Sequence, residues 1–123
     1  MKFDEQVLEK SSNIIKSYTS LSINIHDKNY DYNIMVPPSG PLIKCNMSFT
    51  NISHDYIIKA LKENVNFVII ALDNTECIDK TPIILGLNEF QVGIEFMNFS
   101  AACSSHNILL SEKRNFLSFF LFQ

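Results

Sequence analysis

Only one pair of residues in this chain has the type and spacing of metal ligands. Cys103 and His106 stand three positions apart, and no CxxC or HxxxH pair occurs elsewhere. A metal site needs several such ligands that converge at short range. The others would have to come from distant positions, namely Cys45, Cys77, His26 and His54. We therefore predict no metal and no cofactor, and we expect a small buried thiol beside a surface histidine.

Covalent catalysis has equally little support. A nucleophilic thiol or hydroxyl needs a neighbouring base and a group that orients this base. Cys103 or a serine can be paired on paper with His26 or His54, but 13 serines and three histidines allow many accidental pairs. The strand–turn–helix motif G-x-S-x-G is missing. We predict that the protein is not an enzyme.

Carboxylates are the remaining candidates for acid–base chemistry. Asp27 and Asp31 flank an expected hairpin turn, and three further acids share one loop. His26 and His54 each precede an aspartate, but neighbours on a strand point to opposite faces. Solvated turns and a helix cap explain these acids more simply. The three glycines stand far apart, so the chain has no glycine-rich loop that would hold a phosphate group.

Length and composition narrow the class of protein. A chain of 123 residues fits one domain, which we assign to residues 1–123. The hydrophobic share of 46% excludes a disordered chain. No apolar run approaches the ~20 residues of a membrane-spanning helix. The first six residues are polar and acidic rather than a secretory signal, and three widely spaced cysteines suit a reducing compartment. We expect a cytoplasmic, bacterial protein.

The charge pattern restricts the partners. The formal net charge is -3, and Arg114 is the only arginine. Proteins that bind nucleic acids cluster lysine and arginine on one face, whereas the lysines here are scattered among 13 acidic residues. We expect no direct nucleic-acid contact and no membrane binding. A basic protein is the partner that an acidic chain favours.

The front part predicts a helix followed by a hairpin. Apolar residues recur at helical spacing over residues 3–18. Alternating apolar and polar residues predict strands at 21–26 and 30–36, with Asp27, Lys28 and Asn29 as the turn. The only proline- and glycine-rich stretch, residues 37–41, indicates a rigid connection to the rear part.

The rear part begins with an alternating strand at residues 43–49 and a short helix that Ser53 caps and that ends near Asn64. The continuous apolar run at 67–72 predicts a central strand that is covered on both faces. An acidic loop follows, and two more strands are expected at 83–87 and 90–96. Helices and hairpins mixed in this order predict an α+β fold, with a mainly antiparallel sheet and two or three packed helices.

The last segment allows two interpretations. Ser111 and Glu112 resemble a helix start, so we favour a helix over residues 111–121. The aromatic segment that begins at Phe116 and ends at Phe122 can instead form a buried strand. Either way it must be covered, and a homo-oligomer contact through this segment is one way to cover it.

The main functional hypothesis is protein binding. Tyrosines near the hairpin turn suit an interface, and acids around them would attract a basic partner. We therefore predict an inhibitor or immunity-type protein that neutralises a basic partner, such as a nuclease toxin, by blocking its site. The predicted contact residues are Asp27, Tyr30, Asp31, Tyr32, Asp73, Glu76 and Asp79.

The alternative is a small enzyme or ligand-binding domain with a pocket between sheet and helices. Its candidate groups are Cys103, His106, His54 and Asp55. Convergence of these four side chains in an apolar pocket would favour this alternative, and their dispersal would count against it.

Overall fold

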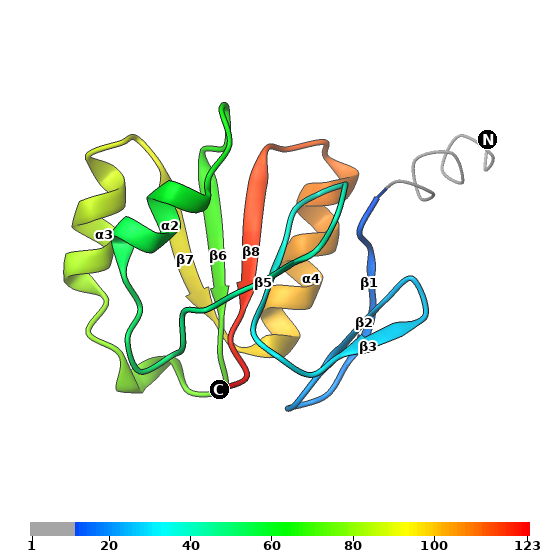
Figure 1. Cartoon of the computed structure of the whole chain (residues 1–123). Coiled ribbons are helices and arrows are strands. Elements are labelled where there is room, and N and C mark those ends of the chain that lie inside the picture. Colours follow the sequence, from blue (N-terminus) through cyan, green and yellow to red (C-terminus); the bar gives the residue numbers. More distant parts are fainter. Residues whose placement is uncertain (1–11) are drawn as a thin grey trace.

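The computed structural model describes residues 12–123 and shows two β-sheets with three α-helices (Figure 1). This is the α+β fold that the sequence predicts. The small sheet consists of β1 (Ile15–Tyr18), β2 (Ile23–Ile25) and β3 (Lys28–Tyr30). The main sheet has the order β5-β4-β8-β6-β7. Its strands are β4 (Ile34–Val36), β5 (Ile43–Lys44), β6 (Phe67–Ala71), β7 (Gly93–Met97) and β8 (Phe116–Phe120).

The apolar run at 67–72 forms the central strand that we predicted. β6 lies between β7 and β8, and it is parallel to both. From Val68 to Ala71 its side chains are fully buried. The other four strand pairs are antiparallel, so the sheets are mainly antiparallel as expected. The parallel core was not anticipated.

Two helices exist because parallel neighbours need a crossover connection. α3 (Thr81–Asn88) links β6 to β7, so the predicted strand at 83–87 is wrong. Pro82 lies in the first turn of α3, where its missing N–H group costs nothing. α4 (Phe99–Ser111) links β7 to β8 and was not predicted at all. Its N-cap is Asn98, whose side-chain oxygen accepts a hydrogen bond from the Ala101 amide at 2.9 Å.

The favoured helix at 111–121 is also wrong. Ser111 ends α4, and Phe116–Phe120 is strand β8, which is inserted between β4 and β6. Every residue of β8 is buried. Two sheet neighbours and a helix thus cover the aromatic segment within the chain itself, which meets the need that led us to consider an oligomer.

The front half differs from the prediction in its pairing. Residues 3–11 of the expected helix lie outside the described range, and residues 15–18 form β1, which pairs with β2. The β2–β3 hairpin is confirmed, but its turn is at His26 and Asp27, whose φ angles of 54° and 64° suit a tight hairpin. The strand expected at 30–36 divides, because β4 joins the main sheet.

Two shorter elements follow. The strand expected at 43–49 is reduced to β5, because Cys45 and Met47 turn into the core as irregular chain. The next helix, α2 (His54–Ala60), has Ser53 as its N-cap as predicted but ends before Asn64.

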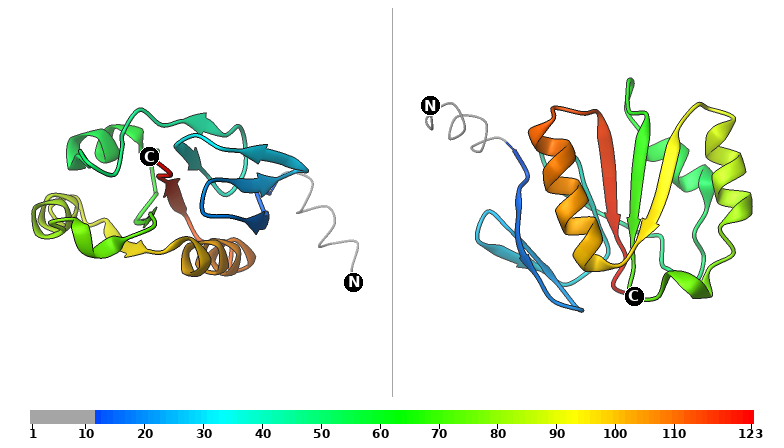
Figure 2. Two further views of the ribbon diagram at one scale, coloured as in Figure 1. Left: turned by 90° about the horizontal axis from the view of Figure 1, so that it is seen from below. Right: turned by 180° about the vertical axis from the view of Figure 1, so that it is seen from behind.

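The main sheet separates two apolar cores. Helices α2 and α3 cover one face, where Ile57 and Leu87 pack against Val68 and Ile70. On the other face, α4 and the small sheet pack against Ile69 and Ala71 of β6. Figure 2 shows this arrangement from below, with α2 and α3 on the opposite side of the sheet from α4.

A glycine sets the spacing of α2 and α3. A Cβ atom placed at Gly86 would lie 2.6 Å from Cγ of His54, which is closer than carbon atoms pack. We predict that Gly86→Ala lowers the free energy of unfolding by about 1–2 kcal/mol, because overpacking outweighs the better helix propensity of alanine. His54→Ala removes the closest contacts, so urea unfolding should show a smaller loss for Gly86→Ala in that background. An equal loss in both backgrounds would show that the contact is not the cause.

Candidate functional site

The predicted hairpin site is accompanied by cations. Asp27 lies in the turn and forms an ion pair of 3.0 Å with Lys16. The rings of Tyr30 and Tyr32 meet edge to face at 6.1 Å, and the Lys44 ammonium lies 5.5 Å from the centre of the Tyr32 ring. Asp31 between the tyrosines is exposed. The lysines offset much of the negative charge expected here.

The predicted acidic loop keeps its charge exposed. Asp73, Glu76 and Asp79 are all exposed, and within residues 12–123 none of them takes part in an ion pair. The loop follows the carboxyl end of β6 and contains a short 3-10 helix, η1 (Thr75–Cys77), which Asn74 caps. No hydrogen bond or ion pair of the described chain joins this loop to the hairpin residues, so the seven predicted contact residues form two groups.

The four residues of the alternative site do not converge. His54 and Asp55 begin α2, whereas Cys103 and His106 belong to α4 on the other face of the sheet. Burial raises the pKa of the Cys103 thiol to about 12, which keeps it protonated and unreactive. Cys103 is the buried thiol that we expected, but His106 is fully buried rather than on the surface.

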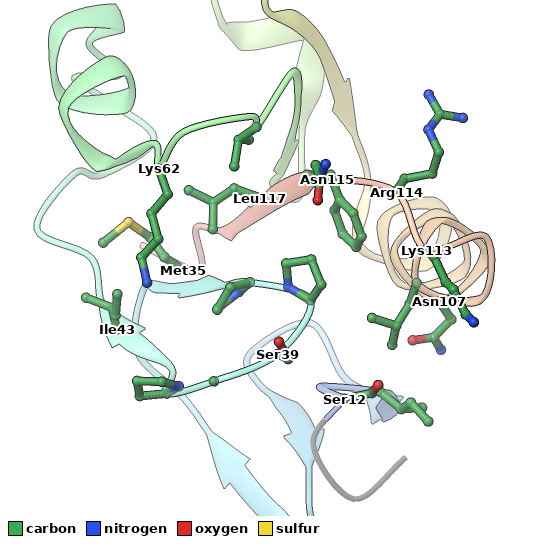
Figure 3. A pocket seen from close by; sticks show the side chains of 18 of the residues that line it. Ser12, Met35, Ser39, Ile43, Lys62, Asn107, Lys113, Arg114, Asn115 and Leu117 are labelled. Atoms are coloured by element: carbon green, nitrogen blue, oxygen red, sulfur yellow. The ribbon is translucent and has the colours of Figure 1, made fainter. Parts of the chain in front are cut away.

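A cavity of about 860 Å³ opens at a different place, beside the amino end of β8 (Figure 3). This volume lies within the range of small-molecule sites. Four segments line the cavity: the start of the described chain, the β4–β5 connection, the chain between α2 and β6, and the end of α4 with the start of β8. The acidic loop lies at the opposite end of the strands, after the carboxyl end of β6.

One side of the cavity is apolar. Met35 of β4 and Leu117 of β8 form its floor and are 6% and 7% exposed. Ile43 of β5 stands beside them and is 45% exposed. Val65, which precedes β6, adds a further apolar side chain. A half-exposed isoleucine in a concave site is surface that an apolar group can cover.

The charged residues around the cavity are mostly positive. Lys62, Lys113 and Arg114 line it together with one acid, Glu63. Figure 3 shows Lys62 extending along one side of the opening toward Ile43 and Met35, while Arg114 extends away. Arg114 also lies 3.6 Å from Glu112. Lys62 is therefore the cation best placed to meet a ligand.

The end of α4 places Lys113 and Arg114 at this rim. The Lys113 amide donates to the carbonyl of Leu110 and the Arg114 amide to that of Leu109, at 3.0 and 3.1 Å. This is the Schellman pattern that ends many helices. Its turning residue is usually glycine, but here Lys113 adopts a φ of 58°. This strained backbone lies at a residue that lines the cavity.

Asn13 holds the connection between β4 and β5, which is one wall of the cavity. Its side-chain nitrogen donates to the carbonyls of Pro37 and Gly40 at 2.9 and 3.0 Å. Its backbone N–H donates to the carbonyl of Pro38 at 2.8 Å. Gly40 has a φ of +91°, which favours glycine. The proline- and glycine-rich stretch is thus a fixed wall.

Asn13 is held in turn by a buried histidine. Nε2 of His106 lies 2.8 Å from the carbonyl oxygen of Asn13, and Nδ1 lies 2.8 Å from the Ser118 hydroxyl. A carbonyl only accepts, so Nε2 carries the proton and the serine donates to Nδ1. Ser118 and His106 are both fully buried, and neither is among the residues that line the cavity. This serine–histidine pair is therefore structural.

The buried imidazole makes stability depend on pH. Burial lowers the pKa of His106 from 6.5 to about 4. The unfolded chain therefore takes up this proton first, and stability that is complete above pH 6.5 is lost as the pH falls toward 4.

We predict that His106→Gln, which keeps a donor and an acceptor but does not titrate, removes this loss. Between pH 6.5 and 4 the wild type should lose about 3 kcal/mol more than the variant. Urea unfolding followed by circular dichroism at several pH values measures the difference. His54→Gln changes a histidine of α2 on the other face of the sheet, whose side chain is 44% exposed, and is the control. If the His106→Gln profile runs parallel to that of the wild type, another group is responsible.

No feature of the sequence indicates this cavity. Its walls come from segments up to about a hundred positions apart, and none of them carries a motif. The proline-rich stretch was the one signal, and it indicated rigidity rather than a ligand. Lys62 looks like any other surface lysine in the sequence.

The fold resembles that of several bacterial proteins. A Bordetella pertussis protein described as an Mth938-like domain is 16% identical, with 89% of this chain and 85% of that chain covered and a TM-score of 0.71. For a Xanthomonas campestris protein the values are 14%, 88%, 83% and 0.74. For a Bartonella henselae protein described as an outer membrane protein they are 19%, 90%, 95% and 0.68. Such low identities show the fold alone.

No curated protein matches the chain. Among residues 12–123, no helix is long and apolar enough to cross a membrane. A family model covers residues 15–121, which is nearly all of the described chain. The chain therefore belongs to the DUF498 family, described as protein of unknown function (DUF498/DUF598).

Proposed function

We propose that this protein is a binding domain for a small organic anion, which occupies the cavity between the β4–β5 connection, Lys62 and the start of β8. The observation that carries the proposal is the lysine that reaches over an apolar concave surface of ligand size. Small-molecule sites typically combine such apolar walls with a few polar groups.

The local charge favours an anion. Three cations and one carboxylate surround the cavity, although the whole chain has a net charge of -3. α4 ends here, and the carbonyl groups at a helix C-terminus act as roughly half a negative charge. When Glu112, which lies 3.6 Å from Arg114, is also counted, an excess of one positive charge remains, and this is larger than the partial charge of the helix end. The rim therefore attracts anions from solution.

The lining supports binding rather than covalent chemistry. Among the described residues that line the cavity there is no histidine, cysteine or aspartate. Ser12, Ser39 and Ser111 line it without an adjacent imidazole.

Cytoplasmic localisation stays a prediction.

The proposal is tested by charge removal. We expect Lys62→Met to weaken the binding of hexanoate about twofold to fivefold, which corresponds to the loss of one exposed ion pair. The methionine keeps the apolar stem. Titrations followed by amide NMR spectra measure the affinity. The largest chemical-shift changes should occur at residues 37–43, 62–66 and 113–117.

Lys59→Met is the matched control, because Lys59 is an exposed lysine of α2 that does not line the cavity. Its affinity should equal that of the wild type. Shifts that gather elsewhere on the protein, or an equal loss in both variants, would contradict an anion site in this cavity.

Inhibition of a basic protein is the second candidate function. It is favoured by the exposed Asp73, Glu76 and Asp79, which have no ion-pair partner within residues 12–123. The combined change Asp73→Asn, Glu76→Gln and Asp79→Asn should abolish low-salt retention of a basic ribonuclease by the immobilised protein. Retention that persists after this change would exclude the loop as the binding site.

A further inference from the structure

We infer, on the basis of the proposed anion-binding function, that the ligand is a soluble amphiphile with one carboxylate and an apolar chain. The carboxylate lies at the Lys62 ammonium, and the chain lies on Met35, Ile43 and Leu117.

The apolar side chains and the lysine lie on the same side of the cavity. Figure 3 shows Lys62, Met35, Ile43 and Leu117 grouped around one part of the opening. Lysine lays its four-carbon stem along apolar surface and keeps its charge at the end. A ligand that meets both features must carry an anion next to an apolar body.

Part of the polar surroundings of this cavity is already hydrogen-bonded within the protein. The Asn107 side chain accepts from the amide of Ile15 at 3.0 Å and donates to the carbonyl of Ile15 at 2.9 Å, so both of its groups are used. The side-chain nitrogen of Asn13 is used by the two loop carbonyls described above. A sugar would have to use the remaining polar lining residues, Ser12, Ser39 and Asn115, which lie on the side of the cavity away from Lys62 and Ile43 (Figure 3).

A nucleotide fits no better. The aromatic residue that lines the cavity in the described chain is Phe116, which is only 1% exposed. Its ring therefore offers no open face on which a base stacks. The half-exposed Ile43 beside the buried Met35 and Leu117 instead offers aliphatic surface, which suits an alkyl chain.

Chain length is the variable that tests this inference. Each methylene group that leaves water for an apolar surface contributes up to about a fourfold gain in affinity. Calorimetric titrations with acetate, hexanoate, octanoate and decanoate below its micelle concentration should show affinity rising with chain length. Decyltrimethylammonium, which has the same chain and a positive head, should bind at least tenfold more weakly than decanoate.

Ile43→Thr tests the apolar wall and keeps the β-branched shape that suits strand β5. We expect it to weaken decanoate binding about threefold to fivefold and to leave acetate unchanged. Ile108→Thr is the matched control, because Ile108 is 55% exposed on α4 and does not line the cavity. Thermal unfolding of both variants checks that they remain folded.

The outcomes separate this inference from the function on which it rests. Equal affinity for acetate and decanoate would overturn the amphiphile and leave a small hydrophilic anion in the cavity. No binding of any carboxylate would overturn both. Equal binding of decanoate and decyltrimethylammonium would overturn the role of Lys62. If the protein sediments with phosphatidylglycerol vesicles but does not bind free decanoate, the inference of a soluble ligand is overturned. The cavity would then bind a membrane surface.

Discussion

The buried ring of His106 is the constraint on which the rest of the structure depends. A neutral imidazole in an apolar core needs partners for both nitrogens, and it finds the Asn13 carbonyl and the Ser118 hydroxyl. These contacts join the start of the described chain, α4 and β8. Loss of either partner would leave a buried polar atom unpaired, which costs about 1–3 kcal/mol. The network therefore fixes the position of three segments relative to one another.

The hydrogen bonds of His106 also determine the shape of the cavity. Asn13 carries the constraint from His106 to the proline-rich connection, because its side chain holds the carbonyls of Pro37 and Gly40. The opposite wall is the start of β8, which is held between β4 and β6. Both walls are thus fixed before a ligand arrives, which lowers the entropy that binding costs.

The two ends of the strands in the main sheet differ in the charge of the residues around them. The acidic loop follows the carboxyl end of β6, and the lysines and the arginine surround the cavity beside the amino end of β8. In open α/β sheets, ligands usually bind outside the carboxyl ends of the strands. In this mixed sheet the cavity is at the other end, because the β4–β5 connection passes over the start of β8 there. A modest net charge of -3 conceals this separation.

The sequence by itself determined the fold class, the central strand β6, the β2–β3 hairpin and the Ser53 cap, because each depends on local periodicity or on a capping side chain. It did not reveal that residues 83–87 form a helix or that Phe116–Phe120 form a strand, since short apolar runs suit both structures. Parallel pairing with β6 decided these cases, because it requires crossover helices before β7 and before β8.

The seven predicted contact residues came from charge and residue type alone, and the structure separates them into two groups. Only the tertiary structure placed Lys62 over Met35, Ile43 and Leu117, because a cavity is built from contacts between segments that are distant in the chain.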